Sequence, residues 1–227
     1  MSIDAKRVRL AVLLSWAAFF VVLWATGTSV RYLGTRTQWV VPFGALTLVA
    51  ASVIAWRTPS RRTPLSLGEG VGLAILLIPL AGVLLMPHAQ LGAYAASRKT
   101  TNFFPAAKPK PPATPRDVSL LDIRVADAEP SFAVVSHIGD GLRVRLRGIV
   151  LHRRAGAFDL GRFLITCCLA DASPIWVPVA WAGPVKSGGW VDVTGTLRKR
   201  GGHLVIAGDR VAPTHAPSDP YLTFAAE

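Results

Sequence analysis

The chain has 227 residues, of which 51% are hydrophobic and 17% are charged, and it carries a formal net charge of +12. This composition is more apolar than that of an average soluble protein, which favours a membrane protein. Residues 1–116 contain 13 Lys and Arg against 2 acids, whereas residues 117–227 contain 12 against 11. The C-terminal half is therefore close to neutral, so the overall charge is not the signature of a nucleic-acid-binding protein.

Three long stretches of the N-terminal part contain no ionisable residue. They lie between Arg9 and Arg31, between Arg36 and Arg57, and between Glu69 and His88. About 20 apolar residues in a helix cross the hydrocarbon core of a bilayer. We therefore predict three transmembrane helices at about residues 10–30, 39–56 and 70–87, within a membrane region of residues 1–90, with contacts to membrane lipid.

The first apolar run could also be a cleaved signal peptide. It is longer than the 7–15 apolar residues usual in such peptides, and no convincing cleavage site follows, so we expect an uncleaved span. Basic residues are more frequent at the N-terminus and in the second loop than in the first loop and after the third span. The positive-inside rule then predicts a multi-pass protein of the cell membrane whose C-terminal domain is extracytoplasmic. The basic residues are Lys6, Arg7, Arg9, Arg57, Arg61 and Arg62 on one side, and Arg31, Arg36, Arg98 and Lys99 on the other.

Residues 91–118 form a juxtamembrane segment and a proline-rich linker. Residues 105–115 include five prolines and two lysines. Such a run favours extended polyproline II structure and neither pairs in a sheet nor continues a helix. We predict a semi-rigid spacer between the membrane region and the domain that follows.

Residues 119–227 show the two-residue period of β-strands. Apolar residues alternate with arginines over residues 142–151, and apolar residues alternate with polar ones again over residues 190–199. Further strands are expected at 158–168, 175–181 and 203–211, with a strand or short helix within 120–138. We predict a soluble, all-β, OB-like five-stranded barrel from two features of these strands. The longest connection lies between the third and fourth strands, and glycines at 148 and 195 lie in the middle of strands, where small barrels bend. A β-sandwich fragment is the alternative.

The adjacent Cys167 and Cys168, followed by Asp171, are the best chemical candidates. Thiolates bind soft or borderline metals, and a nearby carboxylate can join them, so these three residues are a candidate site for a transition metal such as zinc. Neighbouring strand residues point to opposite faces, which opposes a shared ion unless the strand ends there. Burial of the thiols for structural reasons, or a reducible bond between them, are the alternatives, and Asp171 could instead accept hydrogen bonds from turn amides.

Other features of this half indicate no enzyme. Histidines 137, 152, 203 and 215 form no metal-binding motif, and neither a nucleophile elbow nor a phosphate-binding loop is present. Arginines at 143, 145, 147, 153 and 154, with Trp176 and Trp181, could form a basic aromatic face for single strands. The near-neutral domain favours a solvated strand face and no nucleic-acid partner.

Three phrases of the sequence resemble a known family. They are residues 163–172 (FLITCCLADA), residues 190–195 (WVDVTG) and Pro220-Tyr221, preceded by residues 91–93 (LGA) and Arg98. The chain resembles the YcgQ-like family of bacterial membrane proteins over nearly its whole length. Members are described as one subunit of a two-component permease, encoded beside a multi-span permease. The resemblance implies an accessory permease subunit whose extracytoplasmic domain caps or regulates its partner; a membrane-anchored ligand- or metal-sensing module without a transport role is the alternative.

Overall fold

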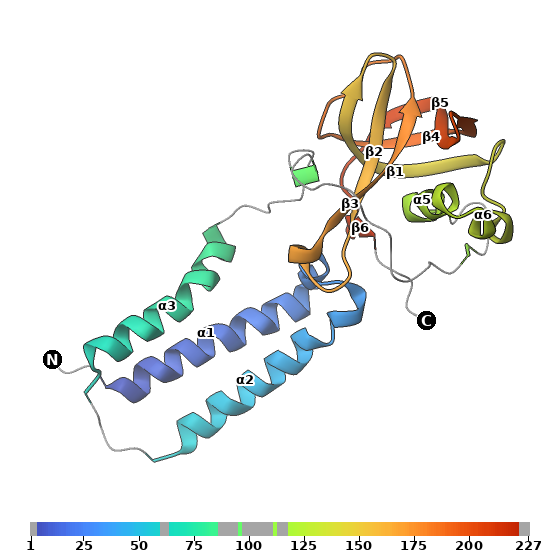
Figure 1. Ribbon diagram of the computed structural model, residues 1–227. Helices are drawn as coiled ribbons and strands as arrows, with labels where there is room; N and C mark the ends of the chain where they lie inside the picture. Colours follow the sequence, from blue (N-terminus) through green and yellow to red (C-terminus); the bar gives the residue numbers. More distant parts are fainter. Residues whose placement is uncertain (1–3, 60–63, 86–94, 97–110, 113–117, 223–227) are drawn as a thin grey trace. The chain divides into compact units, whose positions relative to one another are not determined.

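The computed structural model describes residues 4–59, 64–85, 95–96, 111–112 and 118–222. The chain divides into two compact units, Met1–Gln90 and Leu91–Glu227 (Figure 1). The first, called here the helical unit, holds every predicted membrane span; the second, the β unit, holds every predicted strand. Apart from residues 111–112, the predicted proline-rich run of residues 105–115 falls outside the described residues.

In its described residues, the helical unit contains three α-helices and two short 3₁₀ turns. The helices are α1 (Ala5–Thr26), α2 (Val40–Arg57) and α3 (Leu67–Leu85), and the turns cover Thr28–Arg31 and Thr35–Thr37. Helix α1 begins at Asp4, whose carboxylate accepts the backbone N–H of Lys6 at 3.1 Å. It ends at Gly27, which adopts φ +64° and donates its N–H to the Trp24 carbonyl. Helix α1 therefore begins before the predicted span of about residues 10–30, at the cap formed by Asp4, and ends before it, because the left-handed Gly27 terminates the helix.

Two of the three predicted spans meet the length and hydropathy expected of a membrane helix. Helices α1 and α2 are long and apolar enough to cross a bilayer, and α2 lies within one residue of the predicted 39–56. In α3 the apolar part that the structure describes, Leu67–Val83, is shorter than this. The third span, at residues 70–87, thus remains a prediction, with Pro79 inside the helix as expected.

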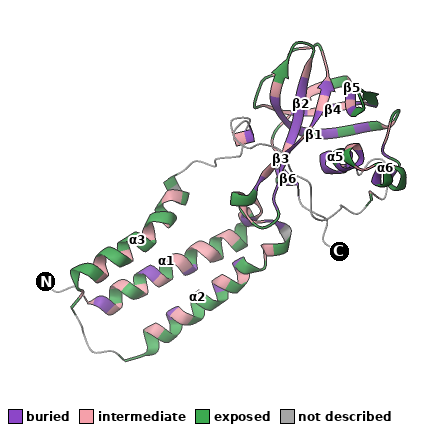
Figure 2. Ribbon diagram, in the orientation of Figure 1, coloured by how far each residue is buried: buried purple, intermediate pink, exposed green. Residues whose placement is uncertain are grey.

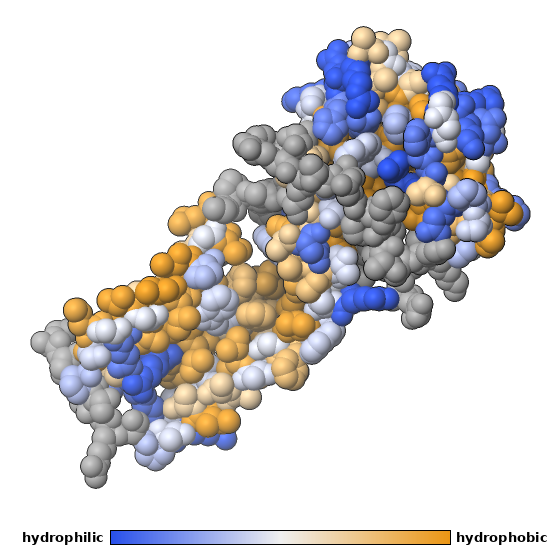
Figure 3. All heavy atoms as spheres, in the orientation of Figure 1, coloured by the Kyte–Doolittle hydropathy of each residue, from blue (hydrophilic) through white to orange (hydrophobic). Residues whose placement is uncertain are grey.

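Helix α1 packs along α2, while α3 is more loosely attached. Gly44 of α2 lies against the Phe20 ring, which would be 3.0 Å from a Cβ at that position. Neither α1 nor α2 buries more than a few residues, and no described side chain of α3 is buried (Figure 2). Apolar residues cover much of the face of the helices seen in Figure 3. The helical unit therefore exposes its apolar side chains rather than enclosing them.

One end of the helical unit gathers the start of α1, the end of α2 and the start of α3. Lys6 donates to the Thr58 carbonyl at 2.6 Å, and Asp4 forms an isolated bridge with Pro64. Arg9 pairs with Glu69 at the start of α3. The chain therefore runs up, down and up again through the three helices, which places the basic N-terminus and the second loop at the same end.

From residue 118 onward, where its described part is continuous, the β unit has two short helices followed by a mixed sheet. The elements are α5 (Leu120–Ala128), α6 (Pro130–Ser136), β1 (Arg143–Arg154), β2 (Ala157–Leu164), the 3₁₀ turn η3 (Leu169–Asp171), β3 (Ser173–Ala180), β4 (Trp190–Arg200), β5 (His203–Pro213) and β6 (Tyr221–Leu222). The expected strand or short helix within 120–138 is thus a pair of helices, so the all-β description is incomplete. The second strand ends at Leu164 instead of Cys168, and the sixth strand was not predicted.

The strands are hydrogen-bonded in the order β1-β4-β5-β3-β2-β6, and β1 also pairs with β2. Strands β1 to β5 therefore form a continuous ring of pairings, 1-2-3-5-4-1. Pairs β3–β5 and β2–β6 are parallel, and the others are antiparallel. Two predicted mid-strand glycines lie where strands approach closely: a Cβ on Gly195 would lie 2.3 Å from the Ala207 carbonyl oxygen, and one on Gly148 would lie 2.8 Å from that of Gly161.

The main core lies on the inner side of these strands and under α5. Its largest fully buried side chains include Phe158 and Leu160 of β2, Leu197 of β4 and Ile206 of β5. Helix α5 adds Leu120 and Ile123 to the same cluster. The alternating residues that predicted the strands are therefore the ones that fill the core.

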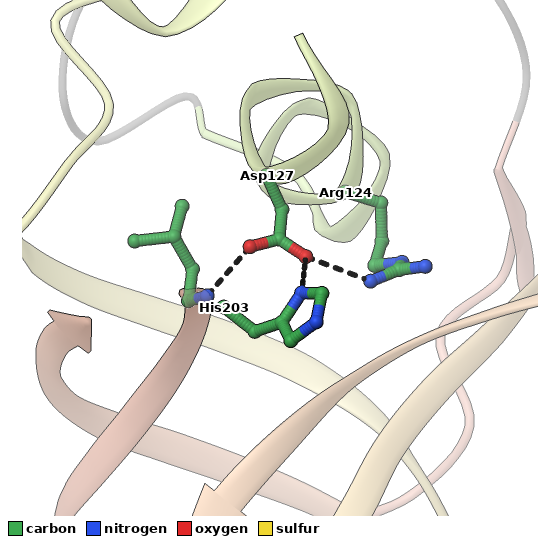
Figure 4. Close-up of polar contacts among 4 residues, drawn as sticks. Arg124, Asp127 and His203 are labelled. Carbon is green, nitrogen blue, oxygen red and sulfur yellow. Dashed lines mark hydrogen bonds and ion pairs between the residues drawn. The ribbon is translucent and has the colours of Figure 1, made fainter. Parts of the chain in front are cut away.

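A carboxylate that is almost buried attaches α5 to β5. Asp127 accepts the backbone N–H of Leu204 at 2.6 Å, and its other oxygen lies 3.1 Å from both His203 Nδ1 and Arg124 Nη1 (Figure 4). At the other end of α5, the side chain and backbone of Ser119 exchange hydrogen bonds with Asp122 in a capping box. These contacts fix both ends of the helix.

Candidate functional site

A second apolar cluster lies outside the main core and is called here the outer cluster. On β1 the residues Ile149 and Leu151 belong to it, whereas Val150 between them belongs to the main core. Both faces of β1 are covered at this point. The outer cluster consists of Ala96, Ile149, Leu151, Phe163, Ile165, Ala172 and Tyr221, with Ala95, Leu169, Trp176 and Trp190 packed against it.

The phrases that carry the family resemblance meet in the outer cluster. Phe163 and Ala172 come from the first phrase, Trp190 begins the second, and Tyr221 belongs to the third. Ala96, which is 2% exposed, comes from the juxtamembrane segment. Sequence reasoning missed this cluster, because its members are separated by up to 125 positions and only the topology brings them together.

Arg162 holds the C-terminal strand in place beside this cluster. Its guanidinium donates to the carbonyls of Asp219 at 2.6 Å, Tyr221 at 2.9 Å and Pro220 at 3.1 Å. Burial lowers the pKa of Arg162, and the neighbouring Asp219 opposes that effect. Three carbonyls thus accept from one side chain, which fixes β6 alongside β2 in the register Phe163↔Tyr221.

The predicted metal ligands Cys167, Cys168 and Asp171 lie on one turn between β2 and β3. The Asp171 carboxylate accepts backbone N–H groups from Cys167 at 2.6 Å, Thr166 at 3.1 Å and Cys168 at 3.4 Å. The alternative in which Asp171 binds turn amides is therefore confirmed. Leu169 and Ala172 anchor the turn in the outer cluster, so the thiols stand on a preformed surface loop.

Cys167 is exposed and Cys168 is half-buried. Partial desolvation raises the pKa of the Cys167 thiol, and the neighbouring Cys168 and Asp171 raise it further. A metal ion that binds this thiol would have to displace its proton. In the part of the chain that the structure describes, no three His, Cys, Asp or Glu side chains are grouped to hold a metal ion. The metal site remains a prediction, and it requires ligands beyond this turn.

A buried carboxylate that the sequence analysis did not single out lies on β2. Asp159 is 1% exposed and accepts two hydrogen bonds from Arg154, at 3.0 and 3.1 Å. His152 Nδ1 lies 3.1 Å from the same carboxylate, and its ring contacts Trp176 edge-on. A register shift between Val150 and Arg153 turns these β1 side chains toward Asp159. The signal in the sequence is an acid within an apolar strand, which must be paired when it is buried.

The basic aromatic face, which the sequence analysis considered and did not favour, is not assembled on the described strands. Arg147 makes a bidentate pair with Asp192 of β4, at 2.7 and 2.9 Å, and Arg154 is engaged with Asp159. Trp181 packs against the main core, and Trp176 packs against the outer cluster. The arginines and tryptophans thus have separate structural roles.

Residues 140–222 are similar to the domain family described as the DUF1980 C-terminal domain. The matched range runs from just before β1 to β6 and includes the turn with Cys167, Cys168 and Asp171, as well as Arg162 and most of the outer cluster. This match is consistent with the YcgQ-like resemblance. No curated protein matches the chain.

Proposed function

We propose that this protein is an accessory subunit of a bacterial membrane permease. In this proposal the helical unit docks onto a multi-span partner in the cell membrane, and the extracytoplasmic β unit caps or regulates the transport pathway. The observation that carries the proposal is that α3 buries none of its described side chains within the helical unit. Its exposed apolar side chains include Leu67 at 89%, Ile78 at 64% and Leu85 at 80%.

The packing of α3 supports a partner in the membrane. Helices α1 and α2 bury Val12, Ala17, Val41 and Ala45, whereas none of the described α3 side chains is buried. A Cβ at Gly72 or Gly82 would meet nothing within 4 Å. Small residues allow close helix–helix contact in lipid, and these two are not used for that purpose within the helical unit. Pro79 frees a carbonyl that a neighbouring helix can satisfy.

Three finer features belong to this proposal. We take α3 as the third transmembrane helix, in agreement with the predicted span of about residues 70–87. We take the ring 1-2-3-5-4-1 as an OB-like barrel; the parallel β3–β5 pair and the close approaches at Gly148 and Gly195 support this. Finally, an up-down-up path with its basic end in the cytoplasm puts the β unit outside the cell.

The test is co-expression with the multi-span membrane protein encoded beside this chain. We expect the two proteins to purify together in mild detergent. The double variant Gly72→Leu/Gly82→Leu adds bulk where the helical unit itself leaves space, and should abolish co-purification. The matched control Leu76→Ile, on the same helix, preserves side-chain volume and should leave it intact.

Two results would contradict the subunit proposal. One is a wild-type chain that purifies without the multi-span protein under conditions in which both remain folded. The other is a Gly72→Leu/Gly82→Leu variant that retains the partner as well as the control does. The first result would show that the two proteins do not form a complex. The second would show that α3 is not the surface through which they interact.

The alternative function, a membrane-anchored metal sensor without a transport role, is favoured by one observation. Cys167 and Cys168 stand on a turn that Asp171 organises before any ligand arrives. Metal analysis of the purified full chain, wild type against Cys167→Ser/Cys168→Ser, tests the site. Zinc in the wild type but not in the variant supports it; equal, negligible zinc in both refutes it. Unchanged metal uptake in a strain lacking the protein would then favour sensing over transport.

A further inference from the structure

A small cavity on the outer side of β1, β4 and β5 is lined by two arginines and a single acid. The cavity has a volume of about 230 Å³ and is lined by Arg145, Asp192, Thr194, Arg210 and Ala212. It is smaller than the ~300–1,000 Å³ of sites for drug-sized ligands, so it suits a single small group.

The strand register places these side chains in one row. Arg145 of β1 lies opposite Thr194 of β4, and Thr194 lies opposite Arg210 of β5. Adjacent strands are about 4.8 Å apart, so the two arginines flank the threonine hydroxyl from either side. A register shift in the β4–β5 pair lies directly beside this row, between Thr194 and Gly195. Bulges of this kind redirect side chains, and here the bulged segment of β5 is the one that carries Arg210.

On the described strands, the face that carries this cavity has four arginines and only two acids. Arg147 holds Asp192 in a bidentate pair at 2.7 and 2.9 Å. Arg143 pairs with Asp209 at 3.4 Å. Arg145 reaches Asp192 only at 3.7 Å, and its side chain is 76% exposed. Among the residues that the structure describes, Arg210 makes no ion pair. Asp192, which lines the cavity, is therefore shared between Arg147 outside it and Arg145 inside it, and Asp209 pairs with Arg143. Two acids face four arginines here, so Arg145 and Arg210 have donors to spare.

We propose that Arg145, Thr194 and Arg210 form a binding site for a phosphate group. Guanidinium groups bind the oxygens of phosphate in a bidentate manner, and two of them match a doubly charged oxyanion. The threonine hydroxyl supplies a further donor between them. The phosphate can be free in solution, or it can be the headgroup of a phospholipid, which a chain with apolar helices would meet at the membrane surface.

The test is calorimetric titration of the full chain in mild, uncharged detergent with inorganic phosphate at low salt. Replacing Arg145 or Arg210 with Gln should weaken binding about tenfold each, and the double variant about 100-fold, because each loses a charge-assisted contact. The matched control is Arg143→Gln, which removes an arginine from the same face of β1 but outside the cavity. It should keep the wild-type affinity within about twofold.

A variant that binds phosphate more tightly than wild type cannot be explained by misfolding. Asp192→Asn removes the negative charge that lines the cavity and frees Arg147, so it should bind phosphate several-fold more tightly than wild type. A parallel titration with glycerophosphoglycerol, the phosphodiester headgroup of phosphatidylglycerol without its chains, separates the two sources. Tighter binding of the diester identifies a lipid headgroup, and tighter binding of inorganic phosphate identifies the free anion.

Three outcomes overturn the proposal. The first is a wild-type chain that binds neither anion at roughly 10 mM, a concentration at which a site with a Kd of about 1 mM would be almost fully occupied. The second is an Arg145→Gln/Arg210→Gln variant that binds like wild type. The third is an Arg143→Gln control that loses as much affinity as the cavity variants, which would show that only the general charge of the face matters.

Discussion

The helical unit and the β unit place their apolar residues in opposite ways. In the part of the chain that the structure describes, every exposed large apolar side chain except Val134 and Val135 lies in the helical unit. The β unit encloses such residues in two clusters, one inside the strands and one outside them. The hydrophobic effect drives burial only where water is the alternative. The difference therefore indicates that the two units are built for different surroundings.

The same substitution at one phenylalanine of each unit gives the largest expected contrast. Phe158 of β2 is fully buried, whereas Phe43 of α2 is 61% exposed. Phe158→Ala should lower the free energy of unfolding of the β unit by about 3–5 kcal/mol, because it leaves a cavity. Phe43→Ala should cost less than about 1 kcal/mol. Urea unfolding of the full chain in detergent, followed by near-ultraviolet circular dichroism, measures both. An equal loss of unfolding free energy in both variants would contradict the difference in burial between the two units.

A charge introduced at one exposed apolar position of each unit gives the next contrast. Leu46 of α2 is 63% exposed and Val134 of α6 is 73% exposed. If α2 faces lipid, Leu46→Lys costs about 2.5–3.5 kcal/mol of insertion free energy and reduces membrane integration. Val134→Lys, facing water, should change stability by about 0.5 kcal/mol or less. The fraction of chain that resists alkaline extraction from membranes measures integration. Full retention of Leu46→Lys would contradict a lipid-facing α2.

The sequence predicted the elements of both units better than it predicted where they end. Charge-free runs located α1 and α2, and the two-residue period located the five main strands. The stop at Gly27 was missed because hydropathy treats it as one more small residue, whereas its φ of +64° ends the helix. The helix α5 was left open between strand and helix, although Ser119 and Asp122 have the spacing of a capping box.

In the candidate site, interactions between residues close in the sequence could be predicted, and interactions between residues far apart in the sequence could not. The role of Asp171 on turn amides was among the alternatives, because it depends on residues three to five positions away. The outer cluster and the three carbonyls on Arg162 depend on contacts across more than 50 positions. Such contacts follow from strand order, which no local pattern specifies.

The polar attachment of α5 gives an intermediate effect. Asp127 is almost buried and accepts a 2.6 Å hydrogen bond from Leu204, with His203 and Arg124 on its other oxygen. Asp127→Ala leaves the Leu204 N–H without its acceptor, and should destabilise the β unit by about 1–3 kcal/mol. The matched control is Asp140→Ala, which removes a carboxylate that is 58% exposed and accepts from Lys199 N–H at 3.0 Å. Water replaces that acceptor, so the cost should stay near 0.5 kcal/mol in the same urea assay.

The smallest expected effect is a dependence of stability on pH. It distinguishes the contribution of an ion pair in the β unit from the contribution of apolar packing. Hydrogen bonding to Arg147 holds the pKa of Asp192 below its ordinary value. A carboxyl whose folded pKa is depressed stabilises the protein above the unfolded pKa, near pH 4, and loses that contribution as pH falls through the folded value. Because the pair is partly exposed, we expect Arg147→Gln to cost less than about 1 kcal/mol at pH 6. The difference between wild type and variant in thermal midpoint should then shrink between pH 5 and about pH 2, since protonated Asp192 no longer attracts the guanidinium. A difference that stays constant over this range would mean that Arg147 stabilises the strand by packing alone.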